Sequence, residues 1–419
     1  IEIAGEDASM TMESGNISAV RETPDSNGQY GVGVTDGGDF TMTGGKIEAG
    51  WFAVAGNGNY KTQNSIINIT DGELISTADY AVYLPQSGTT TISGGKVYGA
   101  AGGVCIQRGT LNVEGTALIT SKGTGSTGNW GDGTGGLDCA AINVSGAYGI
   151  ATVNIKGGTL IAEAKSLITE GTTYTPVINV TGGTFSDPSV LKYMATNATV
   201  DIKLLSNINI AKTELATGYI LNAANATANL NLNGHDIINS SETADATPFT
   251  QIFTVQNGTL NISGNGNVKC DASATAKDDG YRMVIEARGH GTVNIHGGSY
   301  YNTQKLNTQI DLIYARENGK INIYGGTFES GKYGTPNNDT DGRYWVLNLK
   351  NTDKNTASIQ VSGGTFINFN PANPNMDDNE SYLVTGYEVT RDGSVYTAAH
   401  KVGDGRKEYI VGQTSQENR

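Results

Sequence analysis

The chain has 419 residues, of which 58 are Gly and only 8 are Pro. Its 27 basic and 41 acidic residues give a formal net charge of −14, which argues against a nucleic-acid backbone or an anionic membrane as the main partner. Charged residues make up only 16%, so the surface must consist mostly of Asn, Thr, Ser, Gly and Tyr. No apolar run approaches the roughly 18 residues of a membrane span, so we expect no membrane insertion.

Short strands are predicted from one phrase that recurs along the whole chain. It reads apolar, polar, apolar, polar, then Gly-Gly or a variant, then an apolar residue two places later. The copies lie at 10–17, 40–47, 67–74, 90–97, 111–118, 153–160, 178–185, 230–237, 260–268, 293–300, 321–328 and 359–366. Because side chains alternate along a strand, we expect Val153 and Ile155 to point inward and Asn154 outward. The glycines supply the backbone angles of a sharp corner.

A second strand-like run precedes each phrase, as in 251–255 before Asn257-Gly258. Each unit is therefore predicted as strand, corner, strand, Gly-Gly corner, strand and variable loop. One such coil has no lateral partner for its backbone, whereas stacked coils pair their strands and share an apolar core. The sequence therefore predicts an all-β solenoid of about a dozen coils.

The phrase is interrupted in mid-chain, which defines the expected organisation. We predict a first solenoid segment over 1–185, an irregular junction over 186–228, a second segment over 229–370, and terminal cap strands with a tail over 371–419. The stretch Leu191-Lys192-Tyr193-Met194 is expected to form one helical turn at the junction. Two stacked segments and one continuous rod with a large insertion both fit this pattern.

The cysteines and the acidic loops predict no metal and no cofactor. Cys105, Cys139 and Cys270 are widely spaced and form no C-x-x-C pair, and Cys105 lies in an apolar run where a buried thiol is expected. Asp residues in the Gly-rich loops lack the regular spacing of calcium-binding repeats.

The Gly-Gly-Thr phrases at 157–159, 182–184, 325–327 and 363–365 carry a family resemblance, together with the closing segments 381–389 and 395–397. The chain resembles the right-handed parallel β-helix repeat proteins related in fold to pectate lyases, especially the Gly-Gly-Thr-Phe-rich surface proteins of gut bacteria and some of their phages. The resemblance implies a right-handed parallel β-helix. It also implies an extracellular or cell-surface location, with a signal or anchor outside this sequence.

Enzymes of this fold usually act on acidic polysaccharides, and the polygalacturonases among them carry four ordered motifs. This chain has Asp278-Asp279, Gly289-His290-Gly291 and Asn351-Thr352-Asp353, but the last comes too late in the order and the final basic motif is missing. Gly289-His290-Gly291 also lies where other coils have a plain corner. We therefore interpret it as a corner and predict no catalytic residue.

Charged and aromatic residues concentrate on neighbouring coils over 281–345. Aligning the Gly-Gly pairs at 297 and 325 places Arg288 over Arg316 and His296 over Tyr324. Stacked arginines suit a carboxylate-bearing sugar and aromatic rings suit sugar faces, although a solvated wall with glutamates beside the arginines is the alternative. The predicted ligand-binding residues are Glu286, Arg288, His290, His296, Arg316, Glu317, Tyr324, Tyr344 and Trp345. Substituting Arg288 and Arg316 together is expected to abolish binding to acidic glycans.

The leading functional hypothesis is a non-catalytic secreted or surface scaffold, adhesin-like or carbohydrate-binding, with a glycan or host-surface ligand as partner. A polysaccharide lyase or glycoside hydrolase acting on acidic glycans is the second hypothesis. A phage tail-spike or appendage protein is the third. A monomer is favoured, with a trimer as the expectation if the chain is phage-derived.

Overall fold

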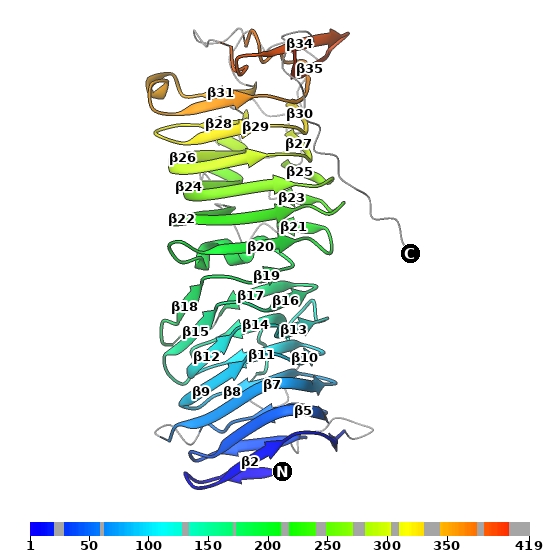
Figure 1. Cartoon of the computed structure of the whole chain (residues 1–419), viewed down its shortest axis with the longest axis vertical. Helices are drawn as coiled ribbons and strands as arrows, with labels where there is room; N and C mark the ends of the chain where they lie inside the picture. Colours follow the sequence, from blue (N-terminus) through cyan, green and yellow to red (C-terminus); the bar gives the residue numbers. More distant parts are fainter. Residues whose placement is uncertain are drawn as a thin grey trace.

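The protein is all-β, and its long parallel sheets are consistent with a β-solenoid. The computed structural model describes residues 1–20, 29–58, 63–127, 134–170, 173–210, 218–239, 249–270, 281–302, 310–330, 344–374 and 381–401, without the side chains at 249, 250, 281, 282, 310 and 344. Strands stack along the long axis from β2 (Ser9–Met12) at the N-terminal end to β34 (Tyr387–Asp392) and β35 (Val395–His400) at the other (Figure 1).

Three sheets form the walls within the described residues. A seven-stranded sheet belongs to the N-terminal half and contains β1 (Glu2–Ala4), β4 (Val32–Thr35), β6 (Val54–Ala55), β8 (Tyr80–Leu84), β11 (Gly102–Ile106), β14 (Ala140–Val144) and β17 (Lys165–Thr169). An eight-stranded sheet belongs to the C-terminal half and contains β21 (Ile208–Ile210), β23 (Ile237–Asn239), β25 (Asn267–Cys270), β27 (Ser299–Asn302), β30 (Thr327–Ser330), β33 (Gly364–Ile367), β35 (Val395–His400) and β34 (Tyr387–Asp392).

A twenty-stranded sheet runs through both halves. Its N-terminal part contains β2 (Ser9–Met12), β3 (Asn16–Ala19), β5 (Asp39–Ala49), β7 (Ser65–Ser76), β9 (Gly88–Ile92), β10 (Lys96–Gly99), β12 (Gly109–Val113), β13 (Leu118–Ser121), β15 (Ala151–Ile155), β16 (Thr159–Ala162), β18 (Val177–Val180) and β19 (Thr184–Phe185). Its C-terminal part contains β20 (Thr199–Lys203), β22 (Tyr219–Asn231), β24 (Phe249–Ser263), β26 (Tyr281–Ile295), β28 (Ile310–Ala315), β29 (Lys320–Ile323), β31 (Tyr344–Leu349) and β32 (Ser358–Val361). Two short 3-10 helices, η1 (Pro188–Tyr193) and η2 (Asn351–Asp353), complete the elements.

The repeated phrase folds as its alternation predicts. Val293 and Ile295 are fully buried, whereas Asn294 between them is half-buried. On the outer face Asn294 donates to Asn261 at 2.8 Å and accepts from Asn322 at 2.8 Å, so the amides form a ladder along the stack. The shared core and the paired edges explain why each coil depends on its neighbours.

Two elements lie where the repeated phrase is interrupted and where it ends. The helical turn expected at the junction is η1, which Asp187 caps by accepting from the Ser189 backbone N–H. The closing segment forms the antiparallel pair β34 and β35, which continues the sheet beyond β33.

Strand partners change in mid-chain, at a boundary that we call the seam. Below it, β19 follows a Gly-Gly corner and pairs with β16. Above β19 lies β20, which pairs with it through Thr184 with Asp201 and Phe185 with Ile202. β20 pairs in turn with the last part of β22, from Thr227 to Asn231, which precedes the corner at Asn233-Gly234. In the N-terminal half, this column of the sheet consists of strands that follow a Gly-Gly corner. In the C-terminal half, the same column consists of strands that precede the equivalent corner. The two halves are offset by one strand position.

Candidate functional site

The offset leaves a break in the wall, and this break is the candidate site. In the described residues, β17 pairs only with β14 and β21 pairs only with β23, so the seven-stranded sheet ends where the eight-stranded sheet begins. A hollow of about 570 Å³ lies between them, beside η1. We call it the seam cleft. Its lining residues come from 124–126, 138–139, 162–168, 186–192, 206–210 and 218–220.

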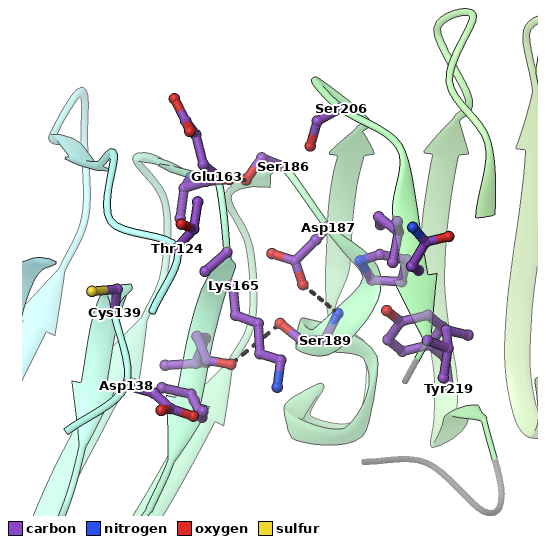
Figure 2. Close-up of a pocket in the computed structure, with 18 of the residues that line it drawn as sticks. Thr124, Asp138, Cys139, Glu163, Lys165, Ser186, Asp187, Ser189, Ser206 and Tyr219 are labelled. Carbon is purple, nitrogen blue, oxygen red and sulfur yellow. Dashed lines mark hydrogen bonds between the residues drawn. The ribbon is translucent and has the colours of Figure 1, made fainter. Parts of the chain in front are cut away.

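The edge of β17 that faces the cleft is capped by side chains. Asp187 accepts from the backbone N–H groups of Ser166 at 2.5 Å and Ser189 at 2.9 Å. The Ser189 hydroxyl donates to the carbonyl of Leu167 at 3.2 Å. Figure 2 shows Asp187 and Ser189 at the centre of the cleft, held by these contacts. The loop after β19 therefore takes the place of a pairing strand.

Both signs of charge border the cleft. Figure 2 shows Asp138, Glu163 and Lys165 on one side of Asp187, with Ser206 and Tyr219 on the other. Glu163 is exposed. Lys192 on η1 is also exposed, and its ammonium lies 4.7 Å from the ring centre of Tyr193. Amide groups are added by Asn207 and Asn209, and the hydroxyl of Ser206 and the ring of Tyr219 complete a wall of mixed donors and acceptors.

Cys139 also borders the cleft, but its chemistry is that of a buried thiol. Its side chain is buried, and burial raises the pKa of the thiol. Because the thiolate is the nucleophilic form, Cys139 is poorly suited to covalent catalysis at neutral pH. Cys105 and Cys270 are likewise buried, as expected for Cys105.

The predicted residues of 281–345 do lie on stacked strands. Ala287 pairs with Ala315 and Thr292 with Lys320, which gives the predicted register of Arg288 over Arg316. The rings of His296 and Tyr324 stack, with centres 4.7 Å apart. Both of these side chains are exposed, and so are those of His290 and Glu317.

Two of the nine predicted residues do not offer a surface group. Glu286 is 1% exposed and Trp345 is 7% exposed, so both are buried in the wall. Tyr344 lies in β31, but its side chain is outside the part that the structure describes. The Asp278-Asp279 pair of the polygalacturonase comparison also lies outside the described residues.

Arg316 is held by carboxylates of its own chain. Its Nε donates to Glu286 Oε1 at 2.6 Å, and its Nη1 donates to Glu317 Oε1 at 2.6 Å. The second oxygen of Glu286 accepts from Gln251 at 3.1 Å. Glu317 also accepts from the backbone N–H of Gly289 at 3.0 Å, which ties this ion pair to the corner of the preceding coil. In the described structure, the guanidinium of Arg316 serves to compensate the buried charge of Glu286.

A second buried carboxyl lies in this network. Burial raises the pKa of Asp311 to about 7, with the charge of Glu286 acting in the same direction, while the hydrogen bond from Asn348 at 2.9 Å lowers it. Asp311 is 4% exposed, so this group lies within the wall. It titrates near neutrality but does not line the seam cleft.

Sequence reasoning located the junction but assigned none of the cleft residues to a ligand-binding site. The signal available was the interruption of the repeat itself, since a break in the phrase marks a break in the strand ladder. No group of three or more His, Cys, Asp or Glu side chains suited to a metal ion occurs in the described part of the chain. Over the same residues, no helix has the length and apolarity needed to cross a membrane.

Comparisons with known proteins add no further constraint. No protein-family model, no curated protein and no solved structure matches the chain.

Proposed function

We propose that this chain is a non-catalytic binding scaffold that works outside the cell or at its surface and binds carbohydrate in the seam cleft. We also propose that it is a right-handed parallel β-helix of about a dozen coils, as the sequence resemblance implies. The observation that supports the binding role is the break in the wall between β17 and β21, which opens a hollow of about 570 Å³. That volume is within the usual range of small-ligand sites, roughly 300–1,000 Å³.

The chemistry of the cleft favours a sugar over a peptide strand. An added strand would need the unpaired backbone edge of β17, but Asp187 and Ser189 already satisfy the groups of Ser166 and Leu167 there. What remains for a ligand is a set of side-chain amides, hydroxyls and charges. Sugar hydroxyls both donate and accept hydrogen bonds, which matches such a mixed lining.

The charge balance favours a neutral sugar. Asp138 and Glu163 are matched in number by Lys165 and Lys192, and the carboxylate of Asp187 is taken up by backbone N–H groups. A ligand with a strong charge of either sign would meet a like charge in the cleft. The hollow is present without a ligand, which also favours binding, because a preformed site loses little conformational entropy when the ligand arrives.

The test is a glycan array followed by titration of a bound neutral oligosaccharide. Glu163 and Asn209 are exposed cleft residues. The double variant E163A/N209A removes two hydrogen-bonding groups, and we expect binding to weaken by about tenfold or more. The matched control is E388A/N351A, which makes the same changes at exposed positions away from the cleft.

Three results would overturn this proposal. Equal binding by E163A/N209A and the unchanged chain would remove the seam cleft as the site. Release of unsaturated or reducing ends from polygalacturonate and other uronans would establish the lyase or hydrolase alternative. A stable trimer in light scattering, combined with no glycan binding, would support the phage-appendage alternative.

A further inference from the structure

A second hollow lies in the N-terminal half, away from the seam cleft. It follows the corner where strands of the seven-stranded sheet turn into β7, β9, β12 and β15, and its volume is about 710 Å³. We call it the corner groove. The side chains that matter most in it are those of Ile66, Arg108, Tyr148, Ile150 and Tyr174.

Stacking of successive coils brings these residues together. Ile66 in β7 pairs with Thr89 in β9, and Thr89 pairs with Thr110 in β12. Gly109 in β12 pairs with Ala151 in β15. The backbone N–H of Gly109 donates to the carbonyl of Ile150 at 3.2 Å, so Arg108 and Ile150 occupy the same corner of consecutive coils. The groove is therefore built on a hydrogen-bonded wall.

Apolar side chains are unusually exposed around this groove. Tyr148, Tyr174 and Ile150 are 38%, 47% and 59% exposed. Ile66 is also exposed, and Val177 in the adjoining strand β18 is exposed beside them. These five make up half of the ten large hydrophobic side chains that are exposed in the described residues. Contiguous exposed apolar groups mark a binding surface more often than isolated ones do.

Arg108 lies across this apolar surface without a carboxylate partner in the described part of the chain. It donates to the carbonyl of Tyr148 at 3.4 Å. Its side chain lies against Gly149, where an added Cβ would come within 2.8 Å of Arg108 Cδ. The missing side chain at Gly149 thus makes the space in which Arg108 rests. In a chain with 41 acidic and 27 basic residues, an arginine without an acid beside it leaves a positive charge uncompensated.

We propose that the corner groove binds a sugar that carries a carboxylate, such as a uronic acid unit of an oligosaccharide. The guanidinium of Arg108 receives the carboxylate, for which its planar fork is suited. The rings of Tyr148 and Tyr174 pack against the C–H faces of the sugar. The concave shape and the volume are those of a small-ligand site, whereas a protein partner needs a larger and flatter surface. This inference rests on the proposed function only in taking carbohydrate as the ligand class.

The test is calorimetric titration of the whole chain with three oligosaccharides of equal length: a trigalacturonate, a neutral galactose trimer and a sulfated galactose trimer. We expect the trigalacturonate to bind and R108A to weaken that binding by at least tenfold. R108K keeps the charge but loses the fork, so an intermediate loss of about threefold to fivefold is expected. R391A is the matched control, because Arg391 is an exposed arginine on β34, far along the chain from the groove.

The variant G149A tests the position of the guanidinium without removing it. An added methyl group must displace Arg108, so the affinity for trigalacturonate should fall while circular dichroism stays unchanged. Unchanged affinity in both R108A and G149A would overturn the inference. So would binding of the sulfated trimer alone, or absence of uronate binding together with a stable complex with a protein partner.

The outcomes separate this inference from the proposed function. E163A/N209A should weaken binding of the neutral glycan and leave binding of trigalacturonate unchanged, and R108A should do the reverse. If neutral glycans bind and trigalacturonate does not, only the corner groove proposal fails. If no carbohydrate binds at all, both proposals fail.

Discussion

Arg316 and Arg108 lie on the same kind of wall and differ in what surrounds them. Arg316 contacts two glutamates, one of which is buried, and its guanidinium holds the wall together. Arg108 lies on glycine and tyrosine, and the described structure provides no acid for it. The comparison teaches that an arginine in an acidic repeat protein is a better candidate for ligand binding when its own chain leaves its charge unmatched.

The largest effect that tests this comparison is expected from R316A. The substitution leaves Glu286 buried and charged without its partner, and breaking such a pair costs about 3–5 kcal/mol. Because the Arg316 side chain is 25% exposed, we expect a loss of about 3 kcal/mol in the free energy of unfolding. Urea denaturation followed by far-ultraviolet circular dichroism measures it.

A loss no larger than that of a surface substitution would show that Arg316 is not structural. This expectation also changes the design of the acidic-glycan test at 281–345. The double substitution of Arg288 and Arg316 would combine lost binding with lost stability. R288A alone is the cleaner variant, since the described residues provide no ion-pair partner for Arg288.

The next largest effect is a dependence of stability on pH that comes from Asp311. Its pKa is about 7 in the folded chain, above the value of about 4 that is usual for an unfolded Asp. The folded state therefore retains a proton that the unfolded state releases, and this group's contribution to stability is lost as pH rises from about 4 to 7. D311N should remove the effect, so the variant gains roughly 2 kcal/mol relative to the unchanged chain between pH 5 and pH 7.5.

Urea denaturation at the two pH values, compared between D311N and the unchanged chain, gives this difference directly. A parallel pH dependence in the two proteins would mean that Asp311 is ionised in the folded wall. Asn at 311 can still accept the hydrogen bond from Asn348, so the comparison isolates the charge.

The smallest effect on stability is expected from R108A. Because Arg108 makes one long hydrogen bond and no ion pair in the described structure, its removal should change the free energy of unfolding by no more than about 0.5 kcal/mol. The same denaturation measurement checks it. A loss comparable to that of R316A would assign Arg108 to the wall and erase the contrast between the two arginines.

Much of the fold follows from local spacing. The glycine corners set the register, and Thr292 lies over Lys320 as the aligned Gly-Gly pairs predict. The helical turn at η1 was foreseen because the phrase stops there. The change of strand partners that places Thr184 under Asp201 could not be predicted. The strand that precedes a corner and the strand that follows it are both short and apolar, so their sequences do not distinguish them. Which of them stacks on which is decided by the path of the connecting loop.

The candidate sites were harder to predict. The sequence places Glu286 beside Arg288 and Arg316 in register, but it does not reveal that Val284, Ile285, Glu286 and Ala287 are all buried in succession. Strict alternation would have put Glu286 at the surface. Arg108 was overlooked because Arg108-Gly109 occupies an ordinary corner. Stacking the corners at 88, 109 and 150 by register would have shown Arg108 between isoleucine and tyrosine residues.

The one-position offset at the seam has a directional consequence. In a wall with three kinds of strand, changing which kind lies above which turns every equivalent corner by about one third of the circumference. The same corner of the repeat therefore points one way below η1 and another way above it. The short connection between β19 and β20 thus allows one repeated sequence to present two differently oriented surfaces. Changing the length of this connection by one strand would turn the C-terminal half relative to the N-terminal half, while each coil kept its own structure.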